Sequence, residues 1–156
     1  MKIEIDQSGK IEQTAKDTVL AISNGDWDTI IIKARTKRQI QEIFRRHGQN
    51  KNFVLFTFSA SLAILIKRNS KHYKNITIDT EYTGKGPIIK EIVLEILSSE
   101  KQTPSIMFGR IGKKSNAHHY AHDTASKEIK PKKTLSLEEV WTAIKKTEVG
   151  KRLKNA

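Results

Sequence analysis

Short apolar segments separated by turn-forming residues constrain the fold of this chain most strongly. Segments 2–6 (KIEID), 18–23 (TVLAIS) and 29–34 (TIIIKA) are rich in β-branched residues and have the length of strands. Asn24 and Gly25, a strong hairpin signal, separate the second segment from the third. Because strands joined by such short turns pair antiparallel, we expect the first three strands to form a meander.

Helical patterns alternate with strands in the rest of the chain. The longest apolar run, 53–66, is ambiguous, since its first half favours a strand and its second half a buried helix. Apolar spacing and capping residues predict helices at 36–48, 87–100, 115–129 and 136–146, and further strands at 75–79 and 105–111. Strands that follow helices can join a sheet in parallel, so the order predicts an α/β fold with a mixed five-stranded sheet and helices on its faces.

The length of 156 residues is most simply that of one domain, with 1–130 as its body and 131–156 as a C-terminal linker and helix. The absence of cysteine excludes disulfides and thiolate zinc sites. The polar start is not a signal peptide, and the longest apolar run is too short to span a bilayer. We therefore expect a cytoplasmic protein without a membrane partner.

The net charge of +12 and the pI near 9.9 suggest an anionic partner, of which nucleic acid is the commonest. Solubility alone is the plainer explanation. Basic residues concentrate in 35–46 and 110–133. Arg110, Lys113 and Lys114, which precede a predicted helix, are either a solvated loop or contacts to backbone phosphates.

Two aspartates, Asp6 and Asp79, end predicted strands that are otherwise apolar. Either one alone is most simply a turn or cap residue. If the two strands are neighbours, Glu42 and Asp123 from predicted helices could face the same edge. Four converging carboxylates repel one another unless cations neutralise them, and two Mg²⁺ or Mn²⁺ ions about 4 Å apart would also clamp a phosphodiester. Glu81, on the same strand face as Asp79, competes with it as a ligand.

Four blocks of the chain, in order, resemble the ribonuclease H family and together cover 2–129. The block IDQSGKIE resembles the family's first-strand TDGS, and TKRQIQEI is similar to its TNNRMEL helix, with Glu42 at or next to the family's glutamate. The block IDTEYTGKGPI resembles TDSQYV, with Asp79 as the aspartate. The block FGRIGKKSNAHHYAHDTASKEI resembles the closing VKGHxxxxxNExADxLA, with Asp123 as the last aspartate and His119 in the asparagine's place.

The resemblance implies a ribonuclease H-like fold and two-metal nuclease chemistry. Asp6 would bridge two Mg²⁺ or Mn²⁺ ions, and Glu42, Asp79 and Asp123 would complete their ligand shells. The expected substrate contacts are Gln7 and Ser8 of the first block together with Arg110, Lys113 and Lys114. The substrate would be RNA in RNA–DNA hybrids or structured nucleic acid. A Holliday-junction resolvase, a class that often carries a histidine just before the final aspartate, and a non-catalytic nucleic-acid-binding module remain open alternatives.

The stretch HHYAHD places His118, His119 and His122 within five residues of Asp123. In a helix, His118 and His122 are neighbours one turn apart and could bind zinc, although no glutamate follows the first histidine to serve as a base. A solvated helix face is a second interpretation. In the nuclease interpretation, Asp123 is a metal ligand and His118 or His119 lies near the scissile phosphate, where it could shuttle a proton.

Overall fold

A six-stranded mixed sheet organises the chain in the computed structural model, which describes residues 2–23, 25–69 and 75–153. The strand order is β5-β4-β1-β2-β3-β6. The antiparallel meander is formed by β1 (Glu4–Ser8), β2 (Thr18–Ser23) and β3 (Trp27–Ile32), while β4 (Asn75–Asp79), β5 (Ser105–Gly109) and β6 (Lys133–Thr134) join in parallel. The predicted meander and the α/β class are confirmed, and β6 is a strand that the sequence did not predict.

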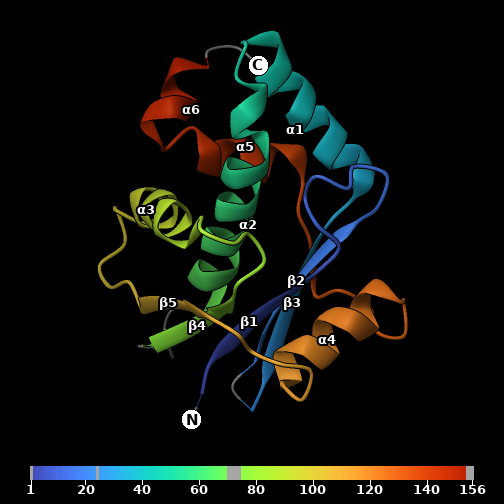
Figure 1. Cartoon of the computed structure of the whole chain (residues 1–156). Helices are drawn as coiled ribbons and strands as arrows, with labels where there is room; N and C mark the ends of the chain where they lie inside the picture. The colour runs from blue at the N-terminus through green and yellow to red at the C-terminus, as the bar shows by residue number, and fades with distance from the viewer. Residues whose placement is uncertain (1, 24, 70–74, 154–156) are drawn as a thin grey trace.

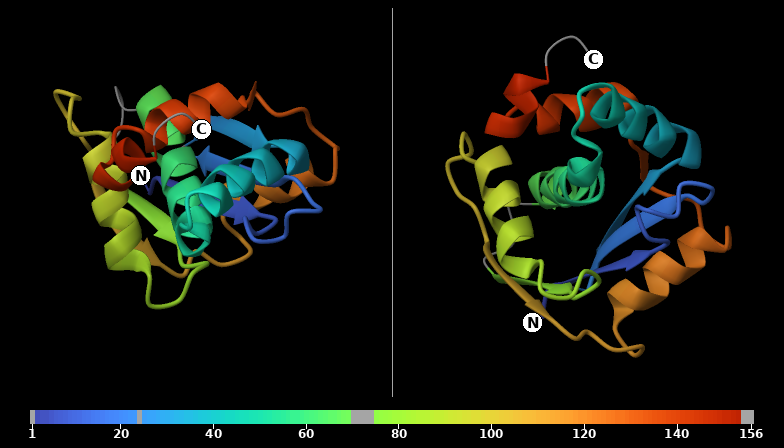
Figure 2. Two further views of the ribbon diagram at one scale, coloured as in Figure 1. Left: turned by 90° about the horizontal axis from the view of Figure 1, so that it is seen from above. Right: turned by 45° about the horizontal axis from the view of Figure 1, so that its top comes forward.

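Helices cover both faces of the sheet (Figures 1 and 2). On one face, α4 lies against β1, β2 and β3; on the other, α2 lies against β2 and β3 and packs against α1, α3 and α5. The helices are α1 (Ala34–Arg46), α2 (Phe53–Asn69), α3 (Gly86–Ile96), α4 (Asn116–Ala125), α5 (Leu137–Ile144) and α6 (Glu148–Arg152), with a short 3-10 helix at Asn50–Asn52. No helix within the described ranges is long and apolar enough to span a bilayer.

The ambiguous apolar segment 53–66 is helical throughout and forms most of α2. This helix is the centre of the layer that faces the sheet, and its side chains are buried nearly all around its axis. A helix surrounded in this way has no polar face, which removes the 3.6-residue pattern that would have identified it from sequence. Residues 70–74, the end of the long connection to β4, lie outside the described part of the chain.

Three helix ends show how local residues set the boundaries. The Ser115 side chain accepts a hydrogen bond from the Ala117 amide at the start of α4, and the predicted capping box of Ser136 and Glu139 begins α5. The predicted N-cap at Thr36 was wrong, because α1 begins two residues earlier, after Lys33. The β2–β3 hairpin is confirmed by the pairing of Ser23 with Trp27, although Asn24 of its turn lies outside the described residues.

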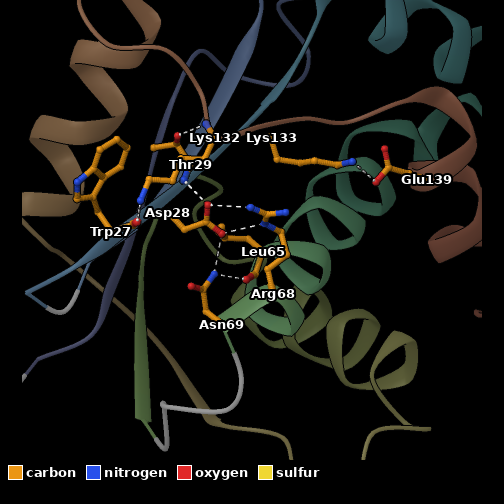
Figure 3. Close-up of polar contacts among 9 residues, drawn as sticks. All are labelled: Trp27, Asp28, Thr29, Leu65, Arg68, Asn69, Lys132, Lys133 and Glu139. Atoms are coloured by element: carbon orange, nitrogen blue, oxygen red, sulfur yellow. Dashed lines mark hydrogen bonds and ion pairs between the residues drawn. The ribbon is translucent and has the colours of Figure 1, made fainter.

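The C-terminal segment, expected as a linker and helix over 131–156, packs as part of the same core as far as it is described. Val140, Trp141 and Ile144 of α5 belong to the main hydrophobic cluster. Figure 3 shows two contacts around the start of β6: the Lys132 amide donates to Thr29 Oγ1 of β3, and Lys133 pairs with Glu139 of α5. The burial and the pairing together explain why residues up to 153 do not form a separate appendage.

Two charged side chains, Asp28 and Lys37, are buried and hydrogen-bonded within the fold. Arg68 and Asn69, at the end of α2, both donate to the Asp28 carboxylate of β3 (Figure 3). The Lys37 ammonium donates to the carbonyls of Lys10 and Gln13 and to Thr18 Oγ1 at 2.8 to 3.1 Å, which uses all three of its protons. Burial lowers the pKa of Lys37 to about 8.

Candidate metal-binding site

The parallel pairing of β1 with β4 brings the two strand-end aspartates to one place. Ile5 lies opposite Ile78, and both side chains enter the core. The next residues, Asp6 and Asp79, therefore point to the other face, on which α4 lies. The expectation that these two strands are neighbours is confirmed.

Asp6, Asp79 and Glu81 offer ligand oxygens that lie within 4.8 Å of one another. Asp6 is buried and the other two are half-buried. Such a group of carboxylates could hold a metal ion, and hard oxygen donors suit Mg²⁺, Mn²⁺ or Ca²⁺ better than zinc. Asp79 and Glu81, which the sequence left as competing candidates, are both members of the group.

The electrostatics of the group favour a positive occupant. Burial raises the pKa of Asp6, and the nearby Asp79 charge adds to this, against the hydrogen bonds from the Gln7 amide and His118. Burial, the hydrogen bond with Asp79 and the Asp79 and Asp6 charges raise the pKa of Glu81 to about 7. The folded chain therefore favours a proton on this cluster, which is the response expected of carboxylates brought together without a counter-charge.

His118 is the histidine that reaches the cluster. Its Nδ1 lies 2.8 Å from Asp6 Oδ2, and when Asp6 is ionised its carboxylate only accepts, so Nδ1 then donates this hydrogen bond. Ser115 supports this contact, because its hydroxyl donates to Glu4 of β1 at 2.9 Å and fixes the start of α4 against the sheet. Nε2 of His118 is the ring nitrogen that remains for another partner.

Tyr82 anchors the segment that carries Glu81. Its hydroxyl accepts from the Ile11 amide at 3.1 Å and from the Gln7 side chain at 3.3 Å. Its ring packs edge-on against Phe58 of α2, with centroids 4.9 Å apart. The loop after β4 is thereby tied to the loop after β1, and the ligands from the two strands are held in register.

The cluster opens into a hollow of about 430 Å³ that also carries positive charge. Arg110 and Lys113 line it together with Asp6, Asp79, Glu81 and His118. Two of the expected phosphate contacts thus lie beside the carboxylates. Lys114 is exposed but does not line this hollow.

Two expected ligands, Glu42 and Asp123, are not part of the carboxylate group. Glu42 lies in the third turn of α1 and pairs with Arg45 and Arg46, on the helix layer opposite α4. Asp123 contacts His122 at 3.4 Å, and its side chain is 40% exposed. The expected four-carboxylate set is therefore not the set that the structure brings together, because α1 lies on the helix layer opposite α4 and because His118, not Asp123, is the α4 residue in contact with Asp6.

Of the remaining expected residues, Gln7 also lines the hollow, whereas Ser8 and His119 do not. The Gln7 side-chain amide donates to the Gly9 carbonyl and to Tyr82, while its Oε1 is buried with no partner within the described residues. Ser8 lines a neighbouring cleft and not the hollow. His119 is exposed, and its ring lies edge-on to the His118 ring, with the ring centroids 5.9 Å apart. His118 and His122 have stacked rings 6.4 Å apart, and neither belongs to a three-ligand group among the described residues, as a zinc site would require.

Comparisons with known proteins add no relative: the chain matches no protein-family model, no curated protein and no solved structure.

Proposed function

We propose that this protein is a divalent-metal-dependent nuclease built on a ribonuclease H-like sheet, with a metal site formed by Asp6, Asp79 and Glu81. The observation that carries the proposal is the carboxylate group itself, which is crowded, half-buried and in contact with His118. The antiparallel meander extended by β4 and β5 in parallel supports the fold part of the proposal.

The donor set fits Mg²⁺ or Mn²⁺. Three carboxylates whose ligand oxygens lie within 4.8 Å of one another supply enough negative charge for one divalent cation, and Mg²⁺ takes its other ligands from water and substrate phosphate. The second ion implied by the family would therefore need oxygens from the substrate. Bound here, such a cation would lower the pKa of a bound water and polarise a phosphoryl oxygen.

The side chains around the cluster supply the remaining functions. Nδ1 of His118 donates its hydrogen bond to Asp6. Nε2 is then the nitrogen that would accept a proton from an attacking water or return one to the leaving oxygen. Arg110 and Lys113 carry the charge that would hold the phosphate against the carboxylates. The basic net charge of +12 suits a polyanionic substrate.

A cleavage assay with matched variants tests the proposal. The protein is incubated with Mg²⁺ or Mn²⁺ and a panel of RNA–DNA hybrid, duplex RNA, duplex DNA and four-way junction. We expect cleavage of at least one substrate, its loss in Asp6→Asn and Glu81→Gln, and a decrease of roughly 10²-fold in His118→Ala. Glu42→Gln, an acid outside the cluster, is the control and should retain activity.

The pattern of results separates the alternatives. Cleavage restricted to the junction would identify a resolvase, and cleavage of the hybrid a ribonuclease H activity. If no substrate is cut, the nuclease proposal fails and a binding module remains. If Glu42→Gln or Asp123→Asn abolishes cleavage while Glu81→Gln does not, the four-carboxylate arrangement inferred from the family resemblance replaces the cluster described above.

A further inference from the structure

A second cleft, of about 730 Å³, lies on the same face of the sheet as the carboxylate cluster. It is bounded by the loop after β1, the end of β3 and the segment that follows α4. Ser8 lines this cleft and Asp6 lines the hollow, and the two residues point to the same face of β1. Two residues along a strand span about 7 Å, so Ser8 of the cleft lies that far from Asp6 of the cluster.

The rim of the cleft is strongly basic. Lys16, Lys33, Lys127 and Lys130 line it, and Asp17 is the one acid among its lining residues in the described part of the chain. Asp17 is already engaged, because it pairs with Lys33 at 3.4 Å and accepts from the Ala34 amide at 2.8 Å. The other three lysines are exposed, and no ion pair joins them to a described residue. They are available to an external anion.

One of these lysines stands in an unfavourable backbone conformation. Lys127 follows the C-cap of α4 with a φ of 68°, in the left-handed region that helix ends usually fill with glycine. A non-glycine residue is strained in this conformation. The chain thus places a cation at the cleft where glycine would be the more stable choice.

The floor of the cleft is apolar. Ile31, Ile129 and Pro131 line it between the lysines. A rim of cations over an apolar floor matches a nucleic-acid strand, whose phosphates alternate with sugars and base faces, better than an acidic peptide, whose charged groups lack such flat apolar neighbours.

We propose that this cleft binds the nucleic-acid strand that extends from the scissile phosphate, with Lys16, Lys127 and Lys130 contacting its phosphates. The inference rests on the proposed function for the location of the scissile bond. Binding in the cleft does not itself require a metal ion, so it can be measured separately from cleavage.

The test measures the binding of fluorescent single-stranded RNA, single-stranded DNA and RNA–DNA hybrid by anisotropy, in chelator. The variant Lys16→Glu/Lys127→Glu/Lys130→Glu is compared with Lys51→Glu/Lys90→Glu/Lys145→Glu, which reverses three exposed lysines on the other helix layer. Both variants change the net charge equally, so only local contacts distinguish them. Melting curves confirm that both are folded.

We expect the cleft variant to bind at least about tenfold more weakly than wild type, and the control variant to remain much closer to wild type. On the single-stranded probes, the slope of log affinity against log salt should become shallower by roughly 0.7 for each phosphate that the substituted side chains no longer neutralise, and only in the cleft variant. Equal weakening in both variants would reduce the effect to net charge and overturn the proposal.

Two further outcomes separate this proposal from the alternative occupant and from the nuclease proposal. Displacement of the oligonucleotide by poly-glutamate at equal charge concentration would identify an acidic protein segment as the occupant and overturn the proposal. Cleft-dependent binding by a wild type that cleaves nothing would support the cleft while removing the nuclease function.

Discussion

Two aspartates of the central sheet, Asp28 and Asp6, are almost equally buried, at 6% and 5% exposure, yet their surroundings have opposite effects. Burial alone would raise the pKa of both. At Asp28, hydrogen bonds from Arg68 and Asn69 and the charge of Arg68 more than offset burial, so its pKa is lowered. At Asp6, Asp79 adds to the effect of burial, so its pKa is raised.

The difference shows which carboxylate the chain neutralises for itself. Asp28 joins β3 to the end of α2 through a charge pair that is complete within the described residues (Figure 3). Asp6 faces two other carboxylates, and in the described part of the chain it pairs only with His118, which is not a permanent cation. A buried charge that the fold does not pair is a candidate for function, whereas a paired one contributes to the fold.

The largest expected difference in stability comes from replacing each aspartate by asparagine. Asp28→Asn removes the charge partner of Arg68 and should lower the free energy of unfolding by about 2 kcal/mol, less than for a fully buried pair because the Arg68 side chain is 35% exposed. Asp6→Asn in chelator should leave stability unchanged or raise it, because it removes repulsion. Urea unfolding measures both, and similar losses in both variants would contradict the contrast.

The pH dependence of stability should separate the two regions further. Because the pKa of Asp28 is lowered by folding, its contribution is present above the unfolded value of 3.8 and is lost as the pH falls through the folded value. The difference in unfolding free energy between wild type and Asp28→Asn should therefore shrink below about pH 3.8. A difference that stays constant to lower pH would show that the pair contributes through packing and not through charge.

The smallest effect tests how Glu81 is held. Tyr82→Phe removes the hydroxyl that receives the Ile11 amide and the Gln7 side chain, so the loop that carries Glu81 should loosen. We expect Mn²⁺ affinity to fall by roughly three- to tenfold, about the contribution of one hydrogen bond. Tyr120→Phe is the control, since that ring stacks on Trp27 away from the cluster. Equal affinities in the two variants would remove the anchoring role.

Much of the sheet could be predicted from the sequence, because strands β1 to β3 combine β-branched runs with short turns. The α2 helix could not, since its uniform burial leaves no periodicity, and β6 is too short to show a pattern. Asp6 and Asp79 were found because both end apolar strands that proved to be neighbours. For these residues, the useful signal was the position at a strand end together with the expected pairing of the two strands.

The rest of the site depends on geometry that spacing cannot give. Glu42 was expected at the cluster from its block in the family resemblance. In the structure it lies in the third turn of α1, where it pairs with Arg46, on the helix layer opposite α4. The choice between His118 and Asp123 depends on how α4 lies on the sheet. One contact that holds its start there is the hydrogen bond from Ser115 to Glu4, two residues that are 111 positions apart in the sequence. Glu81 was only a competitor of Asp79, because a loop that folds back over β1 cannot be recognised locally.

The binding of Mn²⁺ to the metal-free protein tests the central claim most directly. Isothermal titration of wild type, Asp6→Asn and Glu42→Gln compares a cluster ligand with an acid outside the cluster. We expect saturable binding in wild type and in Glu42→Gln, and an affinity at least about tenfold lower in Asp6→Asn, which lacks one charged oxygen ligand. An absence of saturable binding in wild type, or equal affinity in Asp6→Asn, would contradict a metal site at Asp6, Asp79 and Glu81.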